Sequence, residues 1–199
     1  MHADIKINDR IIIYLPCSIE MVELILSCFE IGAIIVPISR RLKPSELQAI
    51  IDKIQPQLII TNWQEREVFN GIAFSRICIE ELPDSSGGCS IINNLYNKKS
   101  DDICAIILTS GTTGMPKAVQ LTYGNFEASC HNWNQFLQFK PGDQFLCSLP
   151  LHHIGGLAVL IRALIYGFSV HLIRNFKARG IFNMISHHPV TIISLVPTV

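Results

Sequence analysis

Short apolar runs rich in β-branched residues alternate with amphipathic segments along the chain. Segment 19–29 carries apolar side chains at Met21, Leu24, Ile25 and Cys28, a spacing typical of a helix with one face on a core. Strands that alternate with such helices predict βαβ units, so the predicted fold class is α/β, with mostly parallel sheets flanked by helices. The predicted strands are 11–15, 34–38, 58–61, 76–79, 103–109, 119–122, 145–148, 170–173 and 191–196, and the predicted helices are 19–29, 43–54, 124–137, 157–166 and 178–187.

A polar stretch interrupts this pattern. Residues 83–102 are rich in Ser, Gly, Asn, Asp and Lys and cannot bury enough apolar surface to pack well. We interpret them as a surface connection between a first βαβ region, 1–82, and a second region, 103–199. The last apolar run leads directly to Val199, whereas chain ends usually lie at exposed positions. We therefore expect residues 1–199 to be part of a larger domain.

Composition excludes several classes of protein. With 199 residues, 49% of them hydrophobic, the chain is long enough for a globular core. Its formal net charge of zero provides no broad electrostatic field to recruit nucleic acid. Glu20, Pro37 and Arg162 break the longest apolar runs, so none reaches the roughly 18 residues of a membrane span. Seven cysteines without a C-x-x-C pair favour a reduced, cytoplasmic protein over a disulfide framework or a metal site.

Glycine, hydroxyl and lysine residues gather directly behind the apolar run 103–108. Glycines let main-chain N–H groups turn toward an anion, hydroxyls add donors, and lysine supplies a positive charge. This composition is typical of a loop that holds a polyphosphate, although a hairpin turn uses the same residues. A P-loop is excluded, because Pro116 stands where its second glycine should be. The candidate nucleotide-binding residues are Thr109, Ser110, Gly111, Thr112, Thr113, Gly114 and Lys117.

The order of these residues resembles the T-S-G-T-T-G-x-P-K-G signature of the adenylate-forming superfamily of acyl-CoA synthetases, luciferases and peptide-synthetase adenylation domains. Ala118 replaces the final glycine. A second block, residues 149–157, is similar to the family's L-P-L-F-H-x-x-G-L segment, with His153 on the family histidine and His152 in place of an aromatic residue. Segments 120–125, 166–170 and 191–196 are most similar to the o-succinylbenzoate–CoA ligase branch of menaquinone synthesis.

The resemblance implies an ATP- and Mg²⁺-dependent ligase that joins a small-molecule carboxylic acid to coenzyme A through an acyl-adenylate. Lys117 and His153 are the catalytic candidates, with Lys117 offsetting phosphate charge. We expect no bound metal among these residues. Adjacent His152 and His153 on an extended segment point to opposite faces, so the two rings are poor co-ligands. It further implies a small C-terminal domain with a catalytic lysine that this sequence lacks, so residues 1–199 alone are not expected to turn over.

Several alternatives stay open at this stage. The acid could instead be a fatty or aryl acid, and the acceptor could be a carrier protein. A noncatalytic phosphate-binding module is the alternative of a different class. Histidine also serves often as a structural residue, so a His153 satisfied by main-chain contacts at the end of a strand is the alternative for this residue.

Overall fold

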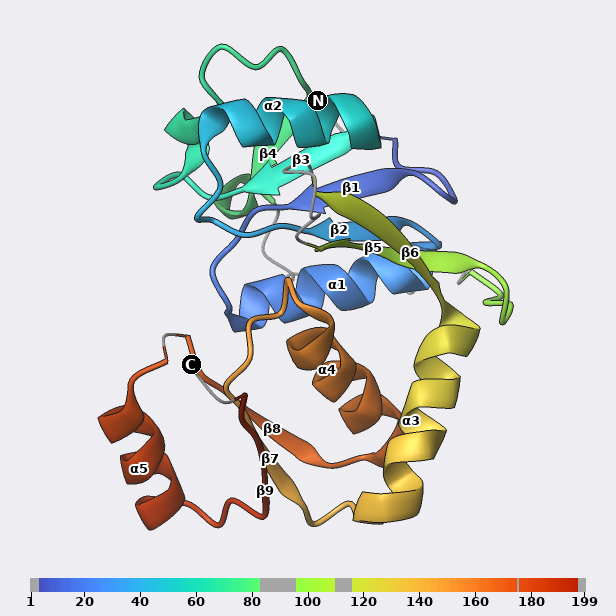
Figure 1. The fold of residues 1–199 in the computed structure, drawn as a ribbon. Coiled ribbons are helices and arrows are strands. Elements are labelled where there is room, and N and C mark those ends of the chain that lie inside the picture. The colour runs from blue at the N-terminus through green and yellow to red at the C-terminus, as the bar shows by residue number, and fades with distance from the viewer. Residues whose placement is uncertain (1–3, 83–95, 110–115, 175, 197–199) are drawn as a thin grey trace. The chain divides into compact units, whose positions relative to one another are not determined.

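The computed structural model describes residues 4–82, 96–109, 116–174 and 176–196. The chain forms two compact units, residues 1–123 and 124–199, and each is described by itself. Figure 1 shows the elements of both along the chain. No helix among the described residues is long and apolar enough to cross a membrane.

A six-stranded sheet forms the centre of the first unit. The strands lie in the order β4-β3-β1-β2-β5-β6, all parallel except β6, which pairs antiparallel with β5. This topology explains the near-continuous apolar runs, because a parallel strand covered on both faces has no polar side. The strands are β1 (Arg10–Ile13), β2 (Ile34–Pro37), β3 (Leu58–Thr61), β4 (Arg76–Cys78), β5 (Ile103–Thr109) and β6 (Lys117–Thr122).

Two helices cover opposite faces of this sheet (Figure 1). Helix α1 (Ile19–Ile31) begins after Ser18, whose hydroxyl accepts from the Met21 N–H, and ends at Gly32 with φ at 75°. Helix α2 (Pro44–Ile54) begins with proline in its first turn. Two short 3₁₀ helices, η1 (Arg66–Phe69) and η2 (Ile79–Glu81), lie after β3 and β4.

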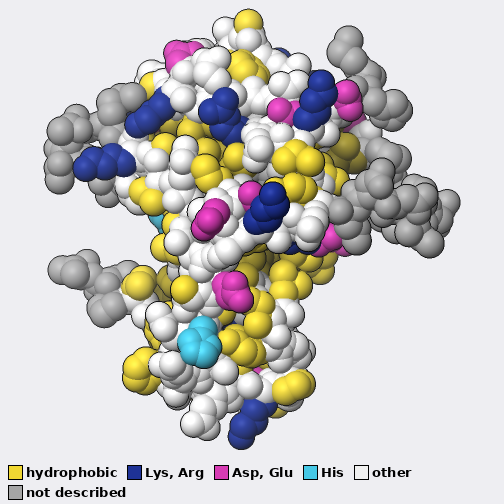
Figure 2. All heavy atoms as spheres, turned by 90° about the vertical axis from the view of Figure 1, so that its right-hand side faces the viewer, with side chains coloured by type: hydrophobic (Ala, Val, Ile, Leu, Met, Phe, Trp, Pro, Cys, Tyr) yellow, Lys and Arg dark blue, Asp and Glu magenta, His cyan; other side chains and the backbone are white. Residues whose placement is uncertain are grey.

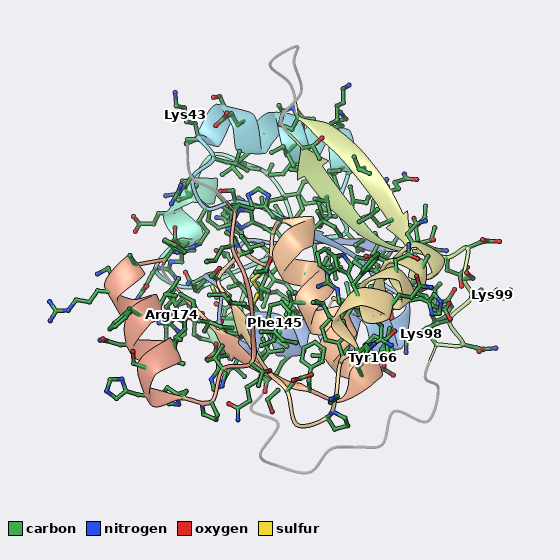
Figure 3. The ribbon with its side chains drawn as sticks, turned by 60° about the horizontal axis from the view of Figure 1, so that its bottom comes forward. Lys43, Lys98, Lys99, Phe145, Tyr166 and Arg174 are labelled. Atoms are coloured by element: carbon green, nitrogen blue, oxygen red, sulfur yellow. The ribbon has the colours of Figure 1, made fainter. Side chains whose placement is uncertain are left out.

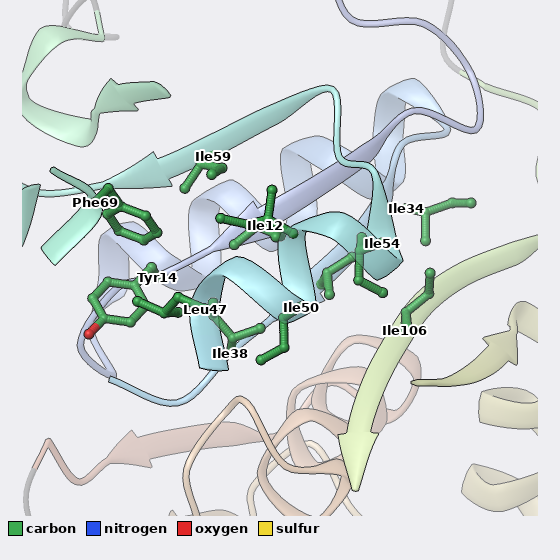
Figure 4. Packing of buried hydrophobic residues seen from close by; sticks show 12 residues of the cluster. Ile12, Tyr14, Ile34, Ile38, Leu47, Ile50, Ile54, Ile59, Phe69 and Ile106 are labelled. Atoms are coloured by element: carbon green, nitrogen blue, oxygen red, sulfur yellow. The ribbon is translucent and has the colours of Figure 1, made fainter. Parts of the chain in front are cut away.

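The core between α2 and the sheet is closely packed (Figure 4). Alternate residues of each strand face α2, as the two-residue repeat of a strand requires. Tyr14 meets Phe69 edge to face, with ring centroids 5.0 Å apart. The twelve residues of this cluster are Ile12, Tyr14, Ile34, Val36, Ile38, Leu47, Ile50, Ile51, Ile54, Ile59, Phe69 and Ile106.

The second unit contains a three-stranded parallel sheet in the order β8-β7-β9. An aromatic group that includes Phe145 and Tyr166 (Figure 3) gathers on it, and Phe139 stacks on Tyr166 with centroids 5.4 Å apart. Phe168 contacts both Phe139 and Phe145. The elements are α3 (Tyr123–Leu137), β7 (Gln144–Cys147), α4 (Ile154–Tyr166), β8 (Ser169–Leu172), α5 (Ala178–His187) and β9 (Ile192–Ser194).

The α/β prediction is confirmed, and every predicted strand and helix is present. Boundaries differ by a few residues where a local contact decides them. Helix α1 runs on to Ile31, because Gly32 is its C-cap, and α4 begins at Ile154, because a turn over residues 150–153 leads straight into it. The proposed division at 83–102 stays a prediction, since residues 83–95 lie outside the described part and the compact units divide between Tyr123 and Gly124.

Charged side chains on the face drawn in Figure 2 are mixed in sign. Lys and Arg lie interspersed with Asp and Glu over the upper part of this view, and no broad basic patch covers it. This distribution agrees with the zero net charge of the sequence. Attraction of a phosphate must therefore be local on this face.

Candidate nucleotide-binding site

Strands β5 and β6 hold the two ends of the candidate phosphate loop. Thr109, the last residue of β5, pairs with Lys117, the first residue of β6, and both side chains are exposed. The preceding residues of β5, from Cys104 to Ile107, are buried, so the strand carries Thr109 from the core directly to the surface. The structure therefore brings together Thr109 and Lys117, two of the candidate nucleotide-binding residues. Ser110, Gly111, Thr112, Thr113 and Gly114 lie outside the described residues.

A third side chain reaches the end of this hairpin. Lys53, in the last turn of α2, donates from Nζ to the main-chain carbonyl of Pro116 at 2.9 Å. Pro116 directly precedes Lys117, so this bond joins α2 to the start of β6. Sequence reasoning missed Lys53, because 63 residues separate it from Pro116.

His153 is the N-cap residue of α4 in the second unit. Its main chain is extended, with φ at −110° and ψ at 148°, and its carbonyl accepts from the N–H groups of Gly156 and Leu157. The His153 N–H donates to the Pro150 carbonyl at 3.0 Å. Its main chain is thus fixed on both sides, whereas its ring is exposed at the start of the helix.

The expectation that the His152 and His153 rings point apart is wrong. Their centroids lie 4.3 Å apart, because residues 151–153 form a turn rather than an extended segment. The two rings nevertheless contribute to no metal cluster, since the described residues contain no group of three or more histidine, cysteine, aspartate or glutamate side chains placed to hold an ion.

Two glycines let α4 approach the segment before it. A Cβ at Gly156 would lie 2.4 Å from the Pro150 carbonyl oxygen, and a Cβ at Gly155 would lie 2.8 Å from Leu149 Cδ1. No side chain fits at 2.4 Å from a main-chain atom, so Gly156 is required for this close packing. The turn that carries His153 is therefore shaped by main-chain contact with the first turn of the helix.

Arg162 lies on the same helix and is only 6% exposed. Its guanidinium lies 5.1 Å from the centre of the Trp133 ring, and its Nε makes no hydrogen bond. The ion pairs between described residues join other side chains, so no carboxylate of this part of the chain offsets the Arg162 charge. A buried cation without such a partner is costly, which marks Arg162 as a candidate for binding an anion.

Burial also shifts the ionisation of Arg162 and its neighbours. Desolvation lowers the pKa of the Arg162 guanidinium, although Cys130 and Cys147 act in the opposite direction. Desolvation raises the pKa of the Cys130 thiol, and the nearby Arg162 charge opposes this shift. Because its pKa is raised, the Cys130 thiol stays neutral near pH 7 and does not serve as a counter-ion for Arg162.

Sequence reasoning also missed Arg162 as a candidate for binding an anion. A charged residue within the otherwise apolar segment 154–170 was a usable signal, because arginine is almost never fully buried without a reason. Its burial against Trp133 could not be read from the pattern, since α3 and α4 meet only in the tertiary structure.

Comparison with known proteins places these features in a family. The family model described as AMP-binding enzyme matches residues 1–199. The chain belongs to this family. This is the family that the sequence segments containing Thr109–Lys117 and His153 resemble.

Two curated relatives are 2-succinylbenzoate–CoA ligases. The ligase of Oceanobacillus iheyensis is 33% identical over 191 residues, which cover 95% of this chain and 39% of the relative. The ligase of Staphylococcus aureus is 33% identical over 214 residues, which cover 96% of this chain and 43% of the relative. The chain thus spans about two fifths of the length of these relatives.

Solved structures agree with this assignment. The o-succinylbenzoate coenzyme A synthetase of Bacillus subtilis in complex with AMP superposes with a TM-score of 0.86 at 29% identity, over 96% of this chain and 50% of that chain. The same synthetase in complex with ATP and magnesium ion gives a TM-score of 0.84 at 28% identity, over 95% of this chain and 50% of that chain. The shared fold therefore covers nearly all of this chain.

Proposed function

We propose that this chain is the nucleotide-binding part of an ATP-dependent ligase that joins 2-succinylbenzoate to coenzyme A. Family membership over residues 1–199 and the identity of the curated relatives support an AMP-forming ligase. The observation that carries the choice of acid is Arg162, a buried guanidinium that no described carboxylate neutralises.

The chemistry of the acid explains why such a cation is useful. 2-Succinylbenzoate carries two carboxylates, of which one is activated while the other stays anionic throughout the reaction. A buried guanidinium binds a carboxylate strongly, because it offers several donors in a planar arrangement and water does not compete. Arg162 lies on α4, whose first residue follows His153, so one helix would hold the unreacted carboxylate and present the family histidine.

The reaction itself requires charge to be offset at the phosphates. The substrate carboxylate oxygen attacks the α-phosphorus of ATP, and the bond to the bridging oxygen breaks to release pyrophosphate. The sulfur of coenzyme A then attacks the acyl carbon, and AMP leaves with the bonding electron pair. Lys117 and the hydroxyl of Thr109, placed side by side at the ends of β5 and β6, would hold the departing pyrophosphate.

The described residues contain no metal-ligand cluster of their own. Magnesium prefers to keep several waters and binds largely through the phosphates of a nucleotide. We therefore propose that Mg²⁺ enters with ATP. In this part of the chain, Lys117 and Thr109 would contact the phosphates that the ion accompanies.

A panel of acids tests this function in the full-length polypeptide that contains these residues. Exchange of labelled pyrophosphate into ATP is measured with 2-succinylbenzoate, benzoate and a long-chain fatty acid, and coenzyme A consumption is measured separately. We expect exchange with 2-succinylbenzoate only. Lys117→Ala should lower it about 10- to 150-fold, the loss that follows when one charged hydrogen bond is removed. Exchange that depends on fatty acid alone, or exchange unaffected by Lys117→Ala, would contradict the proposal.

The noncatalytic alternative predicts a different result. A phosphate-binding module would bind ATP but exchange no pyrophosphate with any acid. A carrier-protein adenylation domain would show exchange without consumption of coenzyme A. The two measurements therefore separate all three functions.

A further inference from the structure

A lysine distant in the sequence contacts the exit of the candidate phosphate loop. Lys53 Nζ donates to the Pro116 carbonyl at 2.9 Å, and Pro116 leads directly into Lys117. The Pro116 carbonyl and the Lys117 N–H belong to the same planar peptide, so a bond to this carbonyl also restrains the main chain of Lys117. The bond therefore acts on the peptide that joins Pro116 to Lys117.

Packing fixes the distance between the two partners of this bond. Ile50 and Ile54, on either side of Lys53 in α2, are buried in the same cluster as Ile106 of β5. Ala118, one residue beyond Lys117, is partly buried against that cluster. The turn of α2 that carries Lys53 and the start of β6 thus pack against one core through their neighbouring residues, which holds the two backbones near each other.

The charge of Lys53 is also directed at the hairpin. Its neighbour Asp52 accepts from Gln48 through Oδ1, at 2.7 Å, and the ion pairs between described residues do not include Lys53. Its ammonium therefore places a positive charge at the Pro116 carbonyl, on the peptide that leads into Lys117.

We propose that Lys53 is a positioning residue for nucleotide binding: by holding the Pro116 carbonyl it fixes the direction of Lys117 at the start of β6. This inference rests on the proposed function where it concerns ATP. The contact between Lys53 and Pro116, and its effect on β6, can be tested without any activity.

The first test measures hydrogen exchange in the full-length polypeptide that contains these residues, without nucleotide. Lys53→Met should speed exchange of the β6 amides that follow Pro116 about 3- to 10-fold, because one hydrogen bond that restrains this strand end is lost. Lys53→Arg, which keeps a donor, should exchange like the original chain. Lys140→Met removes the same charge from an exposed position in the second unit and should leave β6 unchanged. Equal β6 exchange in Lys53→Met and the original chain would overturn the inference.

The second test is a double-mutant cycle in the full-length polypeptide. Lys53→Met should raise the KM for ATP about 3- to 10-fold while kcat and the KM for the acid change less than about 2-fold. Loss of stability alone would instead lower the active fraction and thus kcat. In a Lys117→Ala background, Lys53→Met should have little further effect on the KM for ATP, because the two residues act through the same group.

The two tests separate failure of this inference from failure of the proposed function. If the original enzyme shows no acid-dependent exchange, the proposed function is wrong, and hydrogen exchange still decides whether Lys53 restrains β6. If Lys53→Met changes β6 exchange but leaves the KM for ATP unchanged, Lys53 does not position the nucleotide. Additive effects of Lys53→Met and Lys117→Ala would likewise contradict the proposal.

Discussion

At the scale of single residues, Arg162 is the side chain whose energetics demand explanation. Its side chain is 6% exposed and its Nε is buried without a hydrogen bond, so partial loss of hydration opposes folding, and no ion pair with a described carboxylate offsets it. Contact with the Trp133 ring returns only about 0.5–2 kcal/mol. A charge at position 162 that lowers the stability of the fold is better explained by a role in binding an anion than by a role in folding.

Replacement of Arg162 by methionine tests this explanation. Removing a buried charge and keeping an apolar side chain should change the free energy of unfolding by less than about 1 kcal/mol, or even raise it. Catalytic efficiency with 2-succinylbenzoate should fall about 10- to 150-fold, because a charged hydrogen bond to the second carboxylate is lost. Chemical denaturation and pyrophosphate exchange measure the two effects.

Arg162→Lys serves as the matched control, since it keeps the charge but not the planar set of donors. It should retain part of the efficiency that Arg162→Met loses. A large loss of stability in Arg162→Met with an unchanged KM for the acid would show that Arg162 is structural.

At the scale of elements, the start of α4 depends on main-chain contact. Gly156 lies against the Pro150 carbonyl, and the Cys147 thiol contacts both the Leu149 and Gly156 carbonyls at 3.6 and 3.9 Å. Gly156 and the Cys147 thiol therefore allow close packing between the end of β7, the turn and the start of α4. This fit places His153 at the N-cap rather than within the helix.

Gly156→Ala should disturb this fit more than any ordinary glycine substitution. The new methyl group would overlap a main-chain oxygen that cannot rotate away, so we expect a loss of about 1–3 kcal/mol in unfolding free energy. Gly180→Ala, within α5 of the same unit, meets only Lys177 Cβ at 3.9 Å and should be neutral or stabilising by up to about 1 kcal/mol. Thermal denaturation of both variants measures the difference. Similar melting temperatures for the two would show that the segment before α4 can move aside.

At the scale of the whole molecule, the two compact units differ in how completely they bury their elements. In the first unit, β2 and β3 are buried at every position, and α2 buries its full apolar stripe. In the second, β9 is only partly buried, and α5 buries Ile181 but leaves Phe182 69% exposed. Less apolar surface is therefore removed from water per residue in the second unit.

This difference predicts that the second unit of the 199-residue chain unfolds first. Each unit carries one of the two tryptophans, Trp63 in the first and Trp133 in the second. The Trp63→Phe variant keeps only Trp133, so its fluorescence reports unfolding of the second unit. The Trp133→Phe variant keeps only Trp63 and reports the first unit. We expect a lower denaturant midpoint for Trp63→Phe than for Trp133→Phe. Coincident midpoints in both variants would show that the two units unfold as one cooperative body.

Much of the fold followed from local patterns. The run from Ile103 to Leu108 and the helical stripe of Leu47, Ile50, Ile51 and Ile54 predict their elements, because the repeats of strands and helices are properties of the backbone itself. The pairing of Thr109 with Lys117 did not follow, because the sequence predicts the return strand only from residue 119, whereas β6 begins at Lys117. The predicted start of α4 at residue 157 was wrong, because the turn at residues 151–153 leads directly into a helix that begins at Ile154.

The sequence by itself determined the α/β class, the elements and the phosphate-loop candidates, because periodicity and turn chemistry act between near neighbours. Only the tertiary structure decided that Lys53 meets Pro116 and that Arg162 is buried against Trp133. Both contacts depend on packing between segments that are distant along the chain. The pattern of neighbouring residues does not indicate which distant side chains come into contact in the folded core.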